Sequence, residues 1–117
     1  MNLRMFANIA HKVGAVPIFM PQPRLASSDN DAASKKRILY DLVSMSHDSL
    51  LRAFDIADNI IQKVAEQEGA QIIDVRDEMN GRKKYFSDHV HLTQKGTERL
   101  AKVVANKLEN ILRAAKK

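Results

Sequence analysis

Hydrophobic residues recur at spacings of three and four along three segments of the chain, a pattern that predicts three amphipathic helices. The segments span about residues 2–13, 49–68 and 94–114. Gly14 and Gly69 follow the first two, where a residue in the left-handed conformation commonly ends a helix. Ser49 and Thr93 precede the second and third, and each can accept a hydrogen bond from the first helical turn.

Two short apolar runs predict β-strands, at residues 15–20 and 71–75, each at a Gly-Ala pair that ends a helix. Their apolarity is continuous rather than alternating, which is typical of strands buried on both faces of a parallel sheet. Pro17 weakens the first prediction because proline cannot donate a hydrogen bond to a neighbouring strand. Helix, turn and strand thus follow one another twice, which favours an α/β fold of the doubly wound type.

A long connecting segment, residues 21–48, separates these two helix–strand units. It opens with a proline-rich turn and a polar stretch, and residues 32–45 predict a further helix. The inner face of that helix would carry Ile38, Leu39, Leu42 and Val43. Because the segment follows the carboxyl end of a strand, it would lie where ligands bind in open α/β sheets.

Two strands are too few for an ordinary α/β sheet, which has about five or six. The strand around Ile18 would have an unpaired apolar edge, which is an aggregation hazard. The chain also opens in a helix, with no strand before it. We therefore expect the chain to be the C-terminal part of a larger domain, or to pair through this edge with another chain or with itself.

The composition is that of one globular domain, with 117 residues of which 44% are hydrophobic and 28% charged. The absence of cysteine excludes disulfides, a thiol nucleophile and zinc sites built on thiolates. No apolar run is long enough to span a membrane, and no secretory signal is visible, so the cytoplasm is the default expectation.

The net charge of +5 raises the possibility of nucleic-acid binding. Its basic residues are scattered among acids, however, and the six aromatic residues (two Tyr and four Phe) do not interleave with a basic stripe. We therefore expect a solvated basic surface and no nucleic-acid partner.

The stretch from Tyr85 to Gly96 carries the most chemistry. It is a polar loop before the last helix, and Asp88 and His91 stand three residues apart within it. On a turn, that spacing allows the carboxylate to hydrogen-bond one ring nitrogen of the imidazole, which leaves the other free to accept a proton from a nucleophile. Asp88 and His91 are therefore the candidate catalytic residues.

This block resembles the C-terminal block of the SGNH (GDSL-type) esterases and lipases. The resemblance rests on Phe86-Ser87-Asp88-x-x-His91-Leu92-Thr93-x-x-Gly96, followed by Leu100-Ala101. It implies a flavodoxin-like three-layer α/β/α sandwich, present here as a single partial domain over residues 1–117, with a variable insertion at about 21–48 and the catalytic-block loop at 85–93. It also implies hydrolysis of a small ester (an acetylated carbohydrate, a lipid or another acyl ester) with His91 as general base, Asp88 as the residue that orients it, and no cofactor or metal.

The departures from that family concern the nucleophile. The chain has no Gly-Asp-Ser block, no glycine block for an oxyanion hole and no Gly-x-Asn-Asp block. None of its seven serines stands at a predicted strand-to-helix turn; they are Ser27, Ser28, Ser34, Ser44, Ser46, Ser49 and Ser87. Loss of a catalytic serine costs about 10⁶ in rate, so we expect no significant esterase activity from this chain alone.

Other interpretations of the same residues remain open. Asp88, His89 and His91 could bind a divalent metal, although no fourth ligand can be named beyond a guess at Asp74 or Asp77. Asp88 and His91 could also simply help to start the helix, with His89 as a solvent-facing loop residue. Asp74 could contact substrate, or it could cap the segment that follows it. The alternative to an enzyme is a non-catalytic interaction module, or a truncated gene product, that pairs through its exposed sheet edge.

Overall fold

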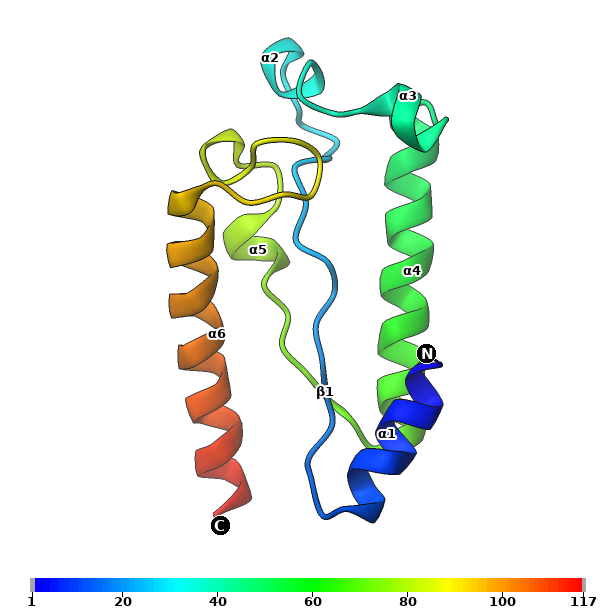
Figure 1. Cartoon of the computed structure of the whole chain (residues 1–117), viewed down its shortest axis with the longest axis vertical. Helices are drawn as coiled ribbons and strands as arrows, with labels where there is room; N and C mark the ends of the chain where they lie inside the picture. Colours follow the sequence, from blue (N-terminus) through cyan, green and yellow to red (C-terminus); the bar gives the residue numbers. More distant parts are fainter. Residues whose placement is uncertain (1, 117) are drawn as a thin grey trace.

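Helices dominate the structure, which is a computed structural model describing residues 2–116 (Figure 1). The elements follow in the order α1 (Leu3–Lys12), β1 (Ile18–Phe19), α2 (Ala32–Lys35), α3 (Tyr40–Val43), α4 (His47–Glu68), β2 (Gln71–Ile72), α5 (Arg76–Met79), the 3-10 helix η1 (Lys83–Tyr85) and α6 (Gln94–Ala115). None of the helices in this part of the chain is long and apolar enough to cross a membrane.

The expected three-layer α/β/α sandwich is wrong. The structure is 60% helix and 5% strand, a small helical protein with a single two-stranded sheet. β1 and β2 run parallel, with Ile18 opposite Gln71 and Phe19 opposite Ile72. A sheet becomes a layer only when several strands lie side by side, whereas here each strand has one neighbour and two paired residues.

The long helices lie where the hydrophobic periodicity predicts them. Thr93 caps α6, since its side-chain oxygen accepts a hydrogen bond from the amide of Gly96 at 3.1 Å. Gly14 and Gly69 adopt φ angles of 76° and 64°, the left-handed conformation that ends α1 and α4.

α4 begins earlier than the sequence pattern indicates. Its N-cap is Ser46, whose side-chain oxygen accepts from the amide of Ser49 at 3.2 Å, and not Ser49 itself. Both residues are good caps, and the helix extends back to the earlier one because His47 bonds to the connecting segment. Its two ring nitrogens contact the Tyr40 hydroxyl at 2.8 Å and the Ser27 carbonyl at 3.1 Å.

The helix expected over residues 32–45 is wrong. This segment forms two four-residue helices, α2 and α3, and Leu39 and Leu42 are exposed rather than inside. The side chain of Arg37 donates to the carbonyls of Lys83 and Phe86, at 3.2 and 3.0 Å, which ties the segment to the loop before α6. Ser44 then adopts φ of 52°, a left-handed conformation that ends α3.

The connecting segment contributes to the core instead of lying over it as a surface insertion. Leu25, Ala26 and Ile38 are buried in the larger hydrophobic cluster, together with residues of α4, α5 and α6. Ile18 packs against that cluster, and Phe19 belongs to a smaller cluster with side chains of α1 and α4. Figure 1 accordingly shows the two strands running between α6 on one side and α1 with α4 on the other.

A network of charges, centred on the buried pair of Arg24 and Asp58, joins the segments that follow the two strands. Asp58 on α4 accepts from Arg24 at 2.8 Å and from Arg76 at 3.0 Å, and Arg76 also pairs with Asp74 at 2.6 Å. The side chains of Arg24 and Asp58 are both buried, and the Arg24 guanidinium lies 4.6 Å from the centre of the Phe54 ring. This network fixes the chain at the point where it leaves β1 and β2.

Candidate catalytic pair

The candidate pair stands on a short closed loop at the amino end of α6. An antiparallel bridge between Phe86 and Leu92 closes the loop, and the side chain of Phe86 is fully buried. The amide of Thr93 donates to the Tyr85 carbonyl at 2.9 Å, and its hydroxyl donates to the Lys84 carbonyl at 2.7 Å. The loop is therefore anchored on both sides of its base.

A further hydrogen bond attaches the loop to the body of the protein. The amide of Leu25, downstream of β1, donates to the carbonyl of His89 at 2.9 Å. Figure 1 shows the loop at the end of the molecule toward which both strands run. The buried Arg24, next to Leu25, thus connects the loop through the chain to the charge network on α4.

Asp88 and His91 are brought together as the sequence predicts. Nδ1 of His91 lies 2.7 Å from Oδ2 of Asp88. Oδ1 of Asp88 accepts from the backbone amides of Val90 and His91, at 2.9 and 2.8 Å. One carboxylate therefore orders the turn with one oxygen and orients the imidazole with the other.

The electrostatics favour an ionised carboxylate at neutral pH. Burial raises the pKa of Asp88, but the hydrogen bonds from the amides of His91 and Val90 and from the His91 ring outweigh it and hold this pKa at about 2. An ionised carboxylate only accepts hydrogen bonds, so Nδ1 of His91 donates to it. In the neutral ring, the lone pair is then on Nε2.

The outer ring nitrogen faces solvent. The side chain of His91 is 77% exposed, and none of residues 2–116 makes a hydrogen bond to Nε2. The two nearest hydroxyls along the chain bond elsewhere: that of Thr93 donates to the Lys84 carbonyl at 2.7 Å, and that of Ser87 donates to the His91 carbonyl at 3.2 Å. Among residues 2–116, the imidazole is thus oriented by a carboxylate and has no hydroxyl bonded to its outer nitrogen.

The expectation of a solvent-facing His89 is wrong. Its side chain is only 8% exposed, and its Nδ1 is buried without a hydrogen-bond partner among the described residues. The tight turn held by Asp88 directs the side chains of the following residues to different sides. The side chain of His89 is therefore buried, while that of His91 faces solvent. No group of three potential metal ligands is found among residues 2–116, which removes the support for a metal site at Asp88, His89 and His91.

Asp74 belongs to the structural network and stands apart from the pair. Its Oδ1 accepts from the backbone amide of Arg76, the first residue of α5, at 3.0 Å. The hydrogen bond from the Arg76 side chain holds the pKa of Asp74 below its ordinary value. This geometry matches the capping interpretation and leaves the carboxylate committed to Arg76.

The pairing of Arg24 with Asp58 is not predicted by the sequence patterns, although the sequence carries one signal of it. Asp58 occupies a stripe position of α4 between Phe54 and Ile61, at spacings of four and three. A carboxylate on the apolar face of a helix requires a buried cation. The identity of that cation could not be read, because Arg24 lies 34 positions earlier in a proline-rich segment.

Comparison with known proteins gives no relative for this chain: no protein-family model matches it, and neither does any curated protein or solved structure.

The carboxyl group of Asp88 is expected to titrate near pH 2 in the folded protein, against an ordinary value of 3.8. Because the folded-state pKa lies below the unfolded one, this group contributes stability that is fully present above about pH 4 and is lost as the pH falls toward 2. Carbon-13 NMR of the side-chain carboxyl measures the midpoint directly. In Asp88→Asn, the loss of stability between pH 5 and pH 2, measured by urea unfolding, should be smaller than in wild type. A midpoint at or above 3.8 would contradict the hydrogen-bond assignment.

Proposed function

We propose that Asp88 and His91 form a general-base pair that activates a hydroxyl group for acyl transfer, as in the hydrolysis of a small ester. The observation that carries the proposal is the 2.7 Å contact between Nδ1 and the ionised carboxylate, with Nε2 left exposed. The resemblance of residues 86–101 to the SGNH hydrolases supports the same roles.

The chemistry of the pair follows from its protonation states. The hydroxyl oxygen attacks the acyl carbonyl carbon while its proton passes to Nε2 of His91. The charge that develops on the imidazolium is stabilised by the Asp88 carboxylate, which keeps the ring in one orientation. The C–O bond to the leaving alcohol then breaks, and the leaving oxygen takes the proton back from Nε2.

The hydroxyl comes from a group that binds at this surface, because no described serine is bonded to Nε2. No oxyanion donors are assigned. Removing one such donor costs about 10²–10³ in rate, so we expect the pair without such donors to be a weak catalyst. In the absence of an added alcohol, we expect the purified chain to show no turnover of p-nitrophenyl acetate above background, and turnover that His91→Ala abolishes would refute this.

The activity of the pair can be measured by supplying the missing hydroxyl as a small alcohol in excess. Transfer of the acetyl group from p-nitrophenyl acetate to that alcohol should be faster with wild type than with His91→Gln or Asp88→Asn. His11→Gln is the matched control, because the His11 ring contacts the Glu68 carbonyl at 2.8 Å and no carboxylate. Equal transfer rates for wild type and His91→Gln would contradict the proposal.

Nitrogen-15 NMR of the His91 ring tests whether Asp88 orients it, independently of any transfer rate. Wild type should show the His91 ring protonated on Nδ1 at alkaline pH, whereas Asp88→Asn should show a mixture of tautomers. A wild-type ring protonated mainly on Nε2 would show that the carboxylate does not orient the base, whatever the transfer rates.

A further inference from the structure

The backbone groups along one edge of β1 form hydrogen bonds with β2. The carbonyls of Pro17 and Phe19 accept from the amides of Gln71 and Ile73, both at 2.9 Å. Backbone groups alternate in direction along a strand, so the odd-numbered residues of this segment face β2.

The opposite edge of β1 is open. By the same alternation, the N–H and C=O groups of Val16, Ile18 and Met20 point away from β2. No backbone hydrogen bond to these three residues is formed on that side by any of residues 2–116. The strand therefore offers three donors and three acceptors along its free edge.

Pro17 does not protect this edge. Proline commonly blunts an edge strand because it lacks an N–H group. Pro17 stands at an odd position, however, and its carbonyl accepts from Gln71 on the side that faces β2. Its missing donor therefore falls on the paired edge, and the free edge keeps its N–H groups.

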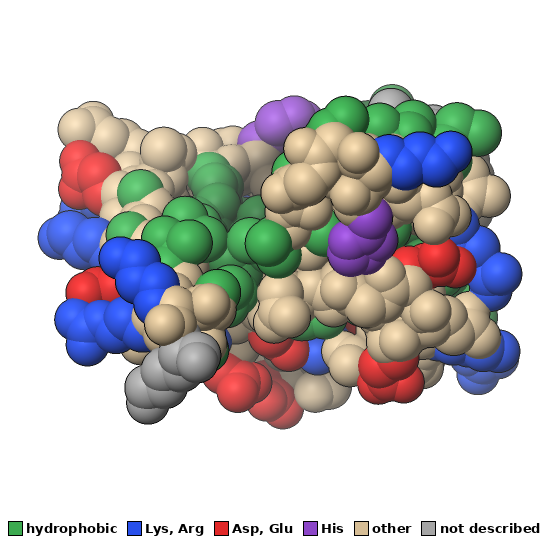
Figure 2. Space-filling view, turned by 90° about the horizontal axis from the view of Figure 1, so that it is seen from below, with side chains coloured by type: hydrophobic (Ala, Val, Ile, Leu, Met, Phe, Trp, Pro, Cys, Tyr) green, Lys and Arg blue, Asp and Glu red, His purple; other side chains and the backbone are tan. Residues whose placement is uncertain are grey.

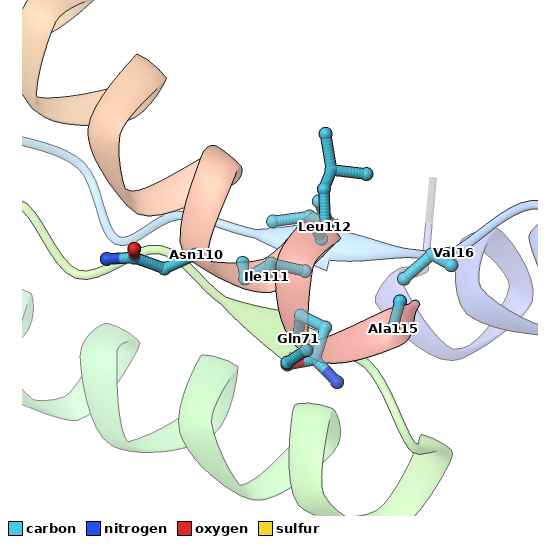
Figure 3. A pocket seen from close by; sticks show the side chains of 8 residues that line it. Val16, Gln71, Asn110, Ile111, Leu112 and Ala115 are labelled. Atoms are coloured by element: carbon cyan, nitrogen blue, oxygen red, sulfur yellow. The ribbon is translucent and has the colours of Figure 1, made fainter. Parts of the chain in front are cut away.

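Apolar grooves flank the free edge on both faces. A cavity of about 520 Å³ lies between β1 and the end of α6, and Figure 3 shows Val16 opposite Leu112 and Ala115 in it. A second cavity, of about 260 Å³, lies between β1 and α1, where Phe6 and Met20 line it. Seen from below in Figure 2, hydrophobic side chains gather in a hollow at this end of the molecule. Among residues 2–116, no charged side chain lines either cavity.

We propose that a second copy of this chain binds here, through antiparallel pairing of the two β1 strands about a two-fold axis at Ile18. In this register Ile18 lies opposite the partner's Ile18, and Val16 lies opposite the partner's Met20. Each of these pairs exchanges two backbone hydrogen bonds. The result is a continuous four-stranded sheet with the order β2-β1-β1-β2.

Self-complementarity favours a second copy over an unrelated strand. A two-fold axis places the same surface on both sides, and the free edge carries donors and acceptors in a register that matches itself. Each copy carries a net charge of +5, but the grooves are lined by uncharged side chains among residues 2–116. The positive charges of the two copies therefore do not repel each other within the contact. Figure 1 shows β1 in the lower half of the molecule and the loop before α6 in the upper half, so the pairing leaves the candidate catalytic pair accessible and does not depend on its function.

The association is tested by sedimentation equilibrium over micromolar to millimolar concentrations. Wild type should reach twice its chain mass of 13.2 kDa. Val16→Lys should raise the dissociation constant by about 100-fold or more, because it places a charge against the apolar pair. Val16 is 58% exposed, so the single chain should still fold, as circular dichroism would show. Leu42→Lys is the matched control: Leu42 is 75% exposed on α3, away from β1, and its substitution should leave the dimer intact.

Amide hydrogen exchange provides a second measurement, which reports which residues of β1 are hydrogen-bonded to the partner strand. The amides of Ile18 and Met20 should exchange slowly in wild type and quickly in Val16→Lys. Those of Gln71 and Ile73 should be equally protected in both, because their bonds to β1 lie within one chain. A wild type that stays monomeric at every concentration, a mass above two copies, or a dimer weakened only by Leu42→Lys would each overturn the proposal.

Discussion

Replacing Asp58 with alanine is expected to lower the free energy of unfolding by about 3–5 kcal/mol, because it leaves a buried guanidinium without its counter-charge. Asp58 accepts from Arg24 at 2.8 Å and from Arg76 at 3.0 Å. Arg76 would keep Asp74, whereas Arg24 is buried, and the carboxylate left to it would be that of the exposed Asp55, at a longer distance of 3.6 Å. Urea unfolding followed by circular dichroism measures the change.

Asp55→Ala is the control for this prediction, since it removes a carboxylate near the same arginine at an exposed position. The Asp55 side chain is 72% exposed, so its loss should cost less than about 1 kcal/mol. Equal effects of the two substitutions would show that the buried network contributes no more than a surface pair.

The Asp58 variant should also disturb the loop of the candidate pair. Arg24 is followed by Leu25, whose amide holds the His89 carbonyl at 2.9 Å. If Arg24 shifts, the turn of Asp88 and His91 loses this attachment. Amide chemical shifts of His89 and His91 should therefore change in Asp58→Ala and stay the same in Asp55→Ala.

Gly96→Ala is expected to destabilise the fold by about 3 kcal/mol, although alanine is the better helix former. A Cβ at this position would overlap the carbonyl oxygen of Tyr85 and lie 2.9 Å from its carbonyl carbon. Both are backbone atoms, and the same carbonyl accepts from the amide of Thr93, so neither can move without opening the base of the loop.

Lys95→Ala provides the comparison, because it changes the neighbouring exposed residue of the same helical turn and should alter stability by less than about 0.5 kcal/mol. Thermal unfolding gives both values. A Gly96→Ala variant as stable as wild type would show that η1 and α6 separate easily. In that event, the distance between Asp88 and His91 would not depend on this contact.

The candidate pair was predictable because it is local. Asp88 and His91 stand three residues apart, and one turn, held by two amide hydrogen bonds to the same carboxylate oxygen, is enough to bring them together. The burial of His89 was not predictable in this way. The contact that the structure gives for it is long-range, since the His89 carbonyl accepts from the amide of Leu25, which the sequence places 64 positions away.

The long helices, and their ends at Gly14, Gly69 and Thr93, were determined by the sequence itself, because apolar spacing and caps act within a few residues of each other. The start of α4 at Ser46 instead accompanies the contacts of His47 with Tyr40 and Ser27. The tertiary structure alone decided how much strand formed, since a strand requires a neighbour. It also decided that residue 96 must be glycine, which carboxylate pairs with Arg24, and which edge of β1 stays open. Each of these outcomes depends on atoms that are distant in the chain and adjacent in space, and no local pattern of residues encodes such a contact.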